Sequence, residues 1–334
     1  MHCSERDEQQ QGRWLGKRLL LCVKILVTLI FCLLIYRNID WPAAWQAMST
    51  VRPATLLLVF AGMLANVAVS TWKWKILLAM HSIDYPFFAL YRYYLIGSFF
   101  NNFLPSTIGG DGYRIYKTVN NPVSKSGAVS AVFMERLTGL LALLITGWLG
   151  GCVASVSTGN ILARQMMIWG SVLLVLLLVG ILAAGRIPSG LITGIRAKIP
   201  EKIVAALVCL QDYRRAPGSV AAVLLLSIVF QVFLLVLYMV LFHEVAGRPV
   251  SIAALAVAVC LSTLMSLLPV SINGIGLLDG SFIYVLSTFH VAYENGLIVM
   301  LLIRLLTYLQ SLVGGIFYFF EKKSRRGSEA RRDA

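Results

Sequence analysis

Charged residues are scarce in this sequence. Asp, Glu, Lys and Arg together make up 13% of its 334 residues, whereas roughly 25% is usual in a soluble domain. Hydrophobic residues account for 58%, and much of this share lies in long uninterrupted runs. A chain with so little charge does not have the surface of a water-soluble domain. We therefore predict an all-α integral membrane protein that crosses the bilayer several times.

Residue patterns typical of enzymes and metal sites are also missing. The six Cys and four His are scattered, and none has the spacing of a zinc site or a disulfide framework. The sequence has no nucleophile elbow and no phosphate-binding P-loop. We therefore expect no metal, no cofactor and no catalytic residue, and we interpret the Cys as small core residues.

Positive charge exceeds negative charge, with 29 Lys and Arg against 15 Asp and Glu. A surplus of this size can indicate nucleic-acid binding. Here the basic residues lie in polar segments beside the apolar runs, which is where membrane proteins place them. We therefore expect membrane lipids as partners and no nucleic acid.

The apolar runs predict about six membrane spans. A run of about 20 apolar residues is long enough to cross the hydrocarbon core as a helix. The second span ends in Trp72-Lys73-Trp74-Lys75, which is typical of an aromatic and basic belt at the membrane interface. The predicted spans are 19–36, 53–72, 128–151, 166–184, 220–242 and 296–320.

A Pro-Gly stretch occurs twice and interrupts apolar runs. Residues 104–112 read LPSTIGGDG and residues 268–276 read LPVSINGIG, an offset of 164 residues. Pro and clustered Gly end a helix, and broken helix at membrane depth survives only where protein or a water-filled cavity satisfies the backbone. We therefore predict two re-entrant helical hairpins, over 87–121 and 252–289.

The distribution of Lys and Arg sets the orientation that we expect. With the N-terminus and C-terminus in the cytoplasm and both hairpins re-entrant, the basic segments face the cytoplasm, as the positive-inside rule requires. The two halves then run in opposite directions, so they are predicted to be inverted repeats. The expected segments are a cytoplasmic N-terminal segment 1–18, a first half 19–184, a basic linker 185–217, a second half 218–320 and a basic tail 321–334.

Two arginines lie inside predicted spans, where charge is costly and is functional by default. They are Arg136 and Arg304, at similar places in the two halves. Arginine binds phosphate through two parallel hydrogen bonds, so we predict that Arg136, Arg304 and Arg114 bind an anionic headgroup. The alternative is structural, with Arg136 paired to an acid and Arg304 bonded to carbonyls of a hairpin.

Residues beside the breaks are predicted to form a path or gate. Asp111 and Asp279 follow the two breaks, where they either control access and proton coupling or cap helix starts. Asparagines near the breaks can satisfy loose backbone groups. The predicted path residues are Asn102, Pro105, Gly109, Gly110, Asp111, Glu135, Pro269, Ser271, Gly274, Gly276 and Asp279.

These motifs resemble a flippase-like family named after the lysylphosphatidylglycerol synthase transmembrane region. The resemblance covers roughly residues 20–320 and implies a bacterial inner-membrane protein of lipid or polyprenyl-linked glycan pathways. Asn273, Leu278 and Asp279 depart from the family's usual Gly-Gly-Ile-Gly motif and the Arg-Glu pair after it. The motifs are Asn102-Phe103-Leu104-Pro105, Gly109-Gly110-Asp111 with Arg114, Glu135-Arg136 with Gly139-Leu140, and Leu268-Pro269 with Ser271, Gly274 and Gly276.

The resulting functional prediction is a lipid translocase. It would move an anionic phospholipid, or a polyprenyl-phosphate-linked lipid, between the two leaflets. No soluble aminoacyltransferase domain follows residue 320, so the lysyl-transfer reaction of two-domain relatives is not expected. Two alternatives stay open: a membrane-embedded transferase acting on such lipids, and a non-catalytic partner of a lipid- or glycan-modifying enzyme.

Overall fold

The computed structural model describes residues 41–49, 51–103, 108–119, 122–186, 216–268 and 274–330, together with residues 37 and 213. Within these ranges the chain is helical and has no strand. The first predicted span, the two Pro-containing breaks and most of the predicted linker lie outside the described residues. Five helices are long and apolar enough to cross a membrane, which confirms a multi-pass membrane protein: α3 (Pro53–Ala79), α6 (Pro122–Thr158), α7 (Ile161–Arg186), α10 (Pro217–Ala246) and α13 (Tyr293–Ala330).

The helices on either side of each break are short and pack against each other. These are α4 (Phe87–Phe103) with α5 (Ile108–Thr118), and α11 (Ile252–Ser266) with α12 (Leu277–Ser287). The two helices that flank each predicted break therefore lie side by side. The remaining short helix, α2 (Trp41–Ser49), packs on α13.

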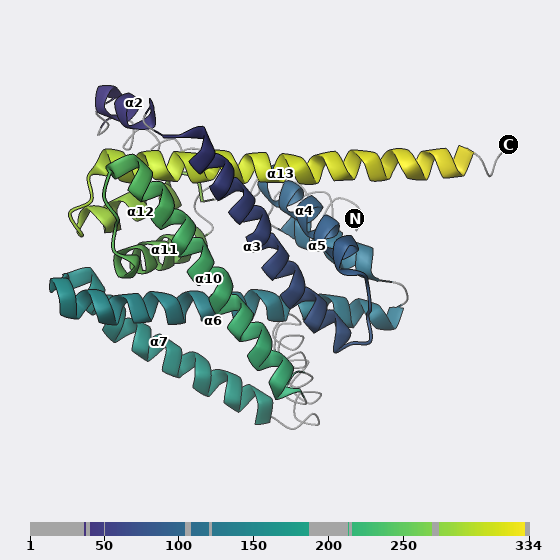
Figure 1. Cartoon of the computed structure of the whole chain (residues 1–334). Coiled ribbons are helices and arrows are strands. Elements are labelled where there is room, and N and C mark those ends of the chain that lie inside the picture. The colour runs from purple at the N-terminus through teal and green to yellow at the C-terminus, as the bar shows by residue number, and fades with distance from the viewer. Residues whose placement is uncertain are drawn as a thin grey trace, which may run out of the picture.

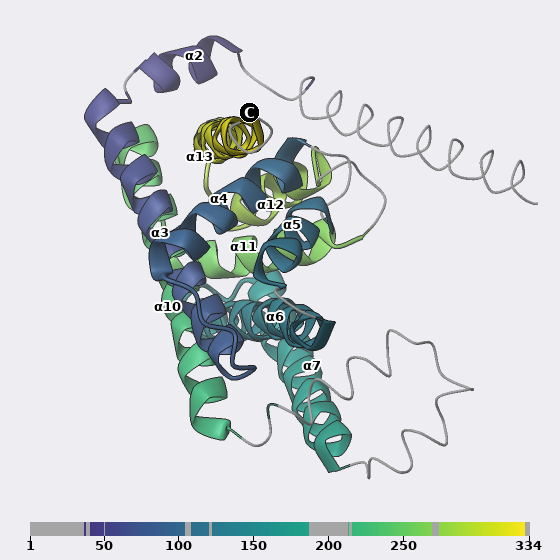
Figure 2. The ribbon, with the colours of Figure 1, turned by 90° about the vertical axis from the view of Figure 1, so that its right-hand side faces the viewer.

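Both helix pairs lie between the two longest helices. In Figure 1, α6 and α13 run in opposite directions along the molecule. Figure 2 looks along them, with α4, α5, α11 and α12 in the space between. The first helix of each pair packs on the long helix of the other half, α4 on α13 and α11 on α6, while α3 packs on α10 and lies beside it in Figure 1. Through this packing, each pair of short helices contacts the long helices of both predicted halves.

The two predicted halves share one succession of helices, α3 to α6 in the first and α10 to α13 in the second. Both α3 and α10 begin with a proline at the first helical position, Pro53 and Pro217, where the missing N–H costs nothing. Their starts are 164 residues apart, the same offset as the two breaks. Each succession consists of a long helix, two short helices and a second long helix.

Helix α3 is longer than predicted, and the predicted interfacial belt is wrong for two of its four residues. Lys73 is 4% exposed and Trp74 is fully buried, while Trp72 is 55% exposed. On a helix, positions 70, 73, 74 and 77 share one side, and this side faces α4, α6 and α10. Lys73 and Trp74 therefore point into the protein.

Two glycines allow backbones to approach closely. A Cβ added at Gly314 of α13 would overlap the Leu95 carbonyl of α4, and one added at Gly110 would overlap the Gly97 carbonyl. Helices in membranes associate through such contacts between small residues. The approach of α13 to α4 therefore depends on Gly314 having no side chain.

Gly314→Ala is expected to lower the melting temperature in detergent and the yield of folded protein, because either α13 or α4 must move. Thermal unfolding checks this, with Gly180→Ala as the matched control. Gly180 lies in α7 with open space around it, so alanine there should be neutral or stabilise by up to ~1 kcal/mol. Equal melting temperatures for Gly314→Ala and the wild type would contradict this packing.

Candidate functional site

A buried ion pair connects α5 to α6. Arg114 and Glu135 are 3% and 6% exposed, and the Arg114 Nη2 group donates to Glu135 Oε2. Tyr94 of α4 donates from its hydroxyl to the other carboxylate oxygen at 2.9 Å. Both oxygens of Glu135 are therefore occupied, which a carboxylate buried in protein requires.

The Arg114 guanidinium also lies between two aromatic rings. Its central carbon is 4.4 Å from the Trp74 ring and 4.3 Å from the Tyr94 ring. Ring faces attract cations, and the attraction grows when water is excluded. Arg114 is thus held on three sides, which favours a role in positioning Glu135 and Asp111.

Arg136 is the accessible cation of this region. Its Nε and Nη2 groups donate to Asp111 at 3.0–3.2 Å, and its side chain is 60% exposed. Asp111 also lies 3.7 Å from Arg114 Nη1. Asp111 therefore bridges the buried arginine and the accessible one.

Lys73 of α3 adds a third cation. It is buried, and its ammonium lies 5.0 Å from the centre of the Phe230 ring of α10. Among the described residues, no carboxylate lies within ion-pair distance of it. A buried ammonium without a carboxylate is costly, so Lys73 is the group in this region whose charge the protein does not neutralise directly.

We call Lys73, Asp111, Arg114, Glu135 and Arg136 the charge cluster. It holds three cations and two carboxylates. Two donors of this region are buried and have no hydrogen-bond partner in the described part of the structure: the Nε of Arg114, within the cluster, and the indole N–H of Trp74, beside it. Unsatisfied buried groups are rare and call for an explanation such as a bound ion or water. The cluster thus has more donors and positive charge than acceptors and negative charge.

The second half contains one ion pair of the same kind. Arg304 of α13 donates from Nη2 to both oxygens of Asp279, at 2.6 and 2.7 Å. Asp279 also accepts the backbone N–H of Gly276 at 2.9 Å, so it caps the start of α12 as well. The capping role expected for Asp279 and its pairing with Arg304 therefore occur together.

The two Asp–Arg pairs occupy corresponding places. Asp111 and Arg136 are 25 residues apart, as are Asp279 and Arg304. The offset between the halves is 168 for both members (279 − 111 and 304 − 136). In each half, the pair ties the helix that leaves a break to the long helix after it.

The structure brings together only some of the predicted residues. Arg114, Arg136, Asp111 and Glu135 form one network, whereas Arg304 pairs with Asp279 in the other hairpin. Asn102 donates to Ser311 of α13 at 2.5 Å, and the Gly110 N–H donates to Asn101 at 2.9 Å. Gly274 and Gly276 have left-handed backbone angles, φ 72° and 80°, which suit glycine. Pro105, Pro269 and Ser271 lie outside the described residues.

Sequence reasoning missed three residues of this region, Lys73, Trp74 and Tyr94. The sequence predicts an interfacial position for Lys73 and Trp74 because they lie beside Trp72 and Lys75. The signal that points inward is the helical spacing with Ser70 and Leu77, both buried. Tyr94 had no comparable signal, because α4 is aromatic along much of its length.

The family model described as the lysylphosphatidylglycerol synthase TM region matches residues 21–314. The chain belongs to this family. The match includes every helix of both halves apart from the last turns of α13, and with them the charge cluster and the Asp279–Arg304 pair. A search among curated proteins found no match.

Proposed function

We propose that this protein moves an anionic lipid, a phospholipid or a polyprenyl-phosphate-linked lipid, between the leaflets of a bacterial inner membrane. Membership of a family named for lysylphosphatidylglycerol synthase makes the protein a lipid-related membrane protein. The observation that carries the proposal is the surplus of positive charge in the charge cluster, together with its buried donors that lack a partner in the described part of the structure.

The surplus favours a phosphate as the missing partner. Burying a cation in protein is tolerated when an opposite charge and hydrogen bonds compensate it. Glu135 is fully used by Arg114 and Tyr94, and Asp111 is shared between two arginines. A headgroup phosphate beside Lys73 and Arg136 would supply the acceptors that the cluster lacks.

In this mechanism Arg136 exchanges partners. Its side chain is open to the surroundings, and a phosphate can replace Asp111 in the same bidentate geometry. Arg114 stays in place, because Glu135 and two rings hold it, and Asp111 then pairs with Arg114 alone. The acyl or prenyl chains remain in the bilayer, so only the headgroup crosses through protein.

We further propose that the halves are inverted repeats and the hairpins re-entrant, with both termini in the cytoplasm. The antiparallel α6 and α13 and the matching Asp–Arg pairs support this arrangement. Asn66 of α3 donates to the carbonyl of Phe230 in α10, its counterpart 164 residues on, at 3.4 Å. Such a contact is expected where repeats cross on a two-fold axis. Arg304 then serves the headgroup from the opposite face, as alternating access requires.

The proposal is tested by leaflet exchange of fluorescent lipids in liposomes, followed by dithionite quenching. Wild-type protein should accelerate exchange of anionic lipids, and Arg136→Gln should slow it at least about tenfold, since hydrogen bonds to charged groups contribute roughly 1.5–3 kcal/mol. Arg164→Gln is the matched control, because Arg164 is exposed on α7 away from the cluster. Arg304→Gln should behave like Arg136→Gln.

No acceleration with any anionic lipid would overturn the translocase. Chemical conversion of the lipid by the purified protein would then favour the transferase alternative. Co-purification with a lipid- or glycan-modifying enzyme, with growth unaffected by the Arg136 and Arg304 variants, would favour the accessory alternative.

A further inference from the structure

A cavity of about 300 Å³ lies at the far end of the molecule from the charge cluster. It is bounded by the end of α6, the connection from α10 to α11 and the connection from α12 to α13. Its polar lining comes from Thr158, Arg248, Ser251, His290 and Asn295, with alanines, valines and Phe289 between them. The volume is at the lower end of the range for ligand pockets, and suits a small polar group.

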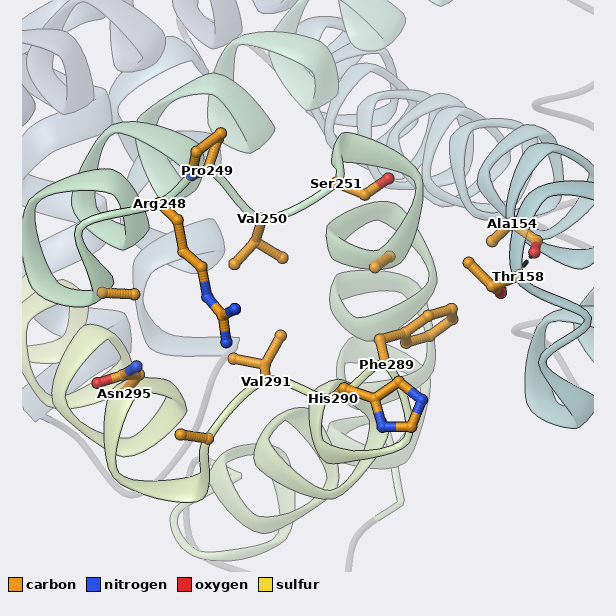
Figure 3. Close-up of a pocket in the computed structure, with 13 residues that line it drawn as sticks. Ala154, Thr158, Arg248, Pro249, Val250, Ser251, Phe289, His290, Val291 and Asn295 are labelled. Carbon is orange, nitrogen blue, oxygen red and sulfur yellow. Dashed lines mark hydrogen bonds between the residues drawn. The ribbon is translucent and has the colours of Figure 1, made fainter.

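Arg248 points into this cavity. Figure 3 shows its side chain extending from the α10–α11 connection into the space between Val250 and Val291. No lining residue is an Asp or Glu, and no carboxylate in the described part of the chain is within ion-pair distance of Arg248. The nearest acid in sequence, Glu244, is bound by Arg52 through its backbone N–H at 3.0 Å and its Nε at 3.7 Å. The guanidinium therefore faces the cavity with its donors unused by carboxylates.

Two helices, α11 and α13, also begin at this cavity. Helix α11 starts after Ser251, whose side chain makes no capping bond. Helix α13 starts after Ala292, which has no side chain able to cap; its carbonyl accepts the Gly296 N–H. Their first N–H groups are thus not satisfied by side-chain caps, and helix starts favour anions. The start of α11, which has no acidic residue in its first turn, adds to the positive potential that Arg248 brings to the cavity, whereas Glu294 in the first turn of α13 offsets the start of that helix.

The cavity and the charge cluster lie at different levels along one helix, the cavity at the end of α6 and the cluster nearer its middle. Ala154, which lines the cavity, follows Arg136 by 18 residues in α6, a rise of about 27 Å. Arg136 lies inside the predicted span 128–151, and Ala154 lies three residues beyond the end of that span. A headgroup that leaves the cluster along α6 in this direction would therefore meet the cavity near the membrane surface.

We propose that this cavity binds a phosphate-type oxyanion, with Arg248 as the principal ligand. For a lipid-borne phosphate, the proposal rests on the proposed function and makes the cavity the second docking site of the headgroup. Free phosphate offers the same chemistry, and the experiment separates the two sources.

The test uses the full chain in phosphatidylcholine nanodiscs with two probes. One is radiolabelled inorganic phosphate, followed by equilibrium dialysis. The other is phosphatidylglycerol with a photoreactive group near its acyl carbonyl, whose crosslinked peptides are mapped by mass spectrometry. Phosphatidylglycerol crosslinks are expected at residues 246–254 and 288–296, and Arg248→Gln should reduce them at least fivefold while Arg164→Gln leaves them unchanged.

A second variant controls for loss of binding through misfolding. His290 has φ 60°, and the N–H groups of His290 and Val291 bond to the carbonyls of Ser287 and Leu286, a helix end usually made with glycine. His290→Gly therefore removes the imidazole without straining the backbone, and should leave the melting temperature unchanged. Binding in this variant should fall by less than in Arg248→Gln.

Each outcome decides between the sources or overturns the site. Crosslinks that are lost in Arg248→Gln identify a lipid-borne phosphate. Binding of inorganic phosphate that is lost in Arg248→Gln, without such crosslinks in the wild type, identifies the free anion. If neither phosphate binding nor phosphatidylglycerol crosslinking changes in Arg248→Gln, the proposed site is wrong even when leaflet exchange is normal. If the crosslinks depend on Arg248 but wild-type protein shows no leaflet exchange, the cavity stands and the translocase fails.

Discussion

Replacing Glu135 with Gln is expected to destabilise the protein severely. The substitution leaves Arg114 buried without its counter-charge, and removing one partner of a buried ion pair typically costs about 3–5 kcal/mol. Asp111, 3.7 Å away, compensates little because Arg136 already occupies it. We expect the melting temperature in detergent to fall by about 10 °C, measured by near-UV circular dichroism.

Two comparisons isolate the buried pair as the cause. Glu244→Gln makes the same chemical change at an ion pair whose Arg52 side chain is 81% exposed, and such pairs contribute only about 0–1 kcal/mol. The double variant Glu135→Gln/Arg114→Met should recover part of the loss, because the uncompensated cation is gone. A melting temperature for Glu135→Gln within about 2 °C of wild type would show that the pair contributes little to folding.

Lys73→Met is expected to have opposite effects on stability and transport. Met keeps the length and the apolar stem but removes a buried charge that no described carboxylate neutralises, so the melting temperature should stay level or rise. If Lys73 binds the headgroup phosphate, leaflet exchange of anionic lipids should fall at least about thirtyfold, since losing a buried charge pair costs roughly 2–5 kcal/mol. Both quantities can be measured on one preparation in liposomes and detergent.

The neighbouring lysine provides the control. Lys75 lies on the same helix but is only partly buried, and Lys75→Met should change exchange less than twofold. Lys73→Arg keeps the cation and should retain more transport than Lys73→Met. Unchanged exchange in Lys73→Met would remove Lys73 from the anion site, and a lower melting temperature with unchanged exchange would assign it a structural role.

Local features of the sequence were enough for the fold class. Membrane spans follow from the lengths of apolar runs, which depend on no distant partner, and five of the six predicted spans correspond to helices in the described residues. The ends of α4 and α11 were also well placed, because Pro105 and Pro269 end helices by local chemistry. The long helices that come after α5 and α12 are longer than predicted. α6 begins at Pro122 and α13 continues to Ala330, because polar helix can extend past the hydrocarbon into water.

The partners of the charged residues were less predictable. The sequence allows Arg136 to pair with an acid as the alternative to anion binding. Nothing in the spacing points to Asp111, which lies 25 residues earlier in a different helix. The repeated 25-residue spacing in Asp279 and Arg304 is visible in the sequence, but it gains meaning only once both pairs are seen. The anion-site roles of Arg114, Arg136 and Arg304 remain predictions.

The sequence by itself determined that this chain crosses a membrane several times, that two Pro-Gly breaks interrupt it, and which charges lie within the apolar runs. Only the tertiary structure decided which helix faces meet, and so placed Lys73 and Trp74 beside Arg114, with no carboxylate of the described residues within ion-pair distance of Lys73. The physical reason is the solvent. In water a helix reveals its packing side by an apolar stripe, whereas lipid is as apolar as a protein core and a membrane helix is apolar all round.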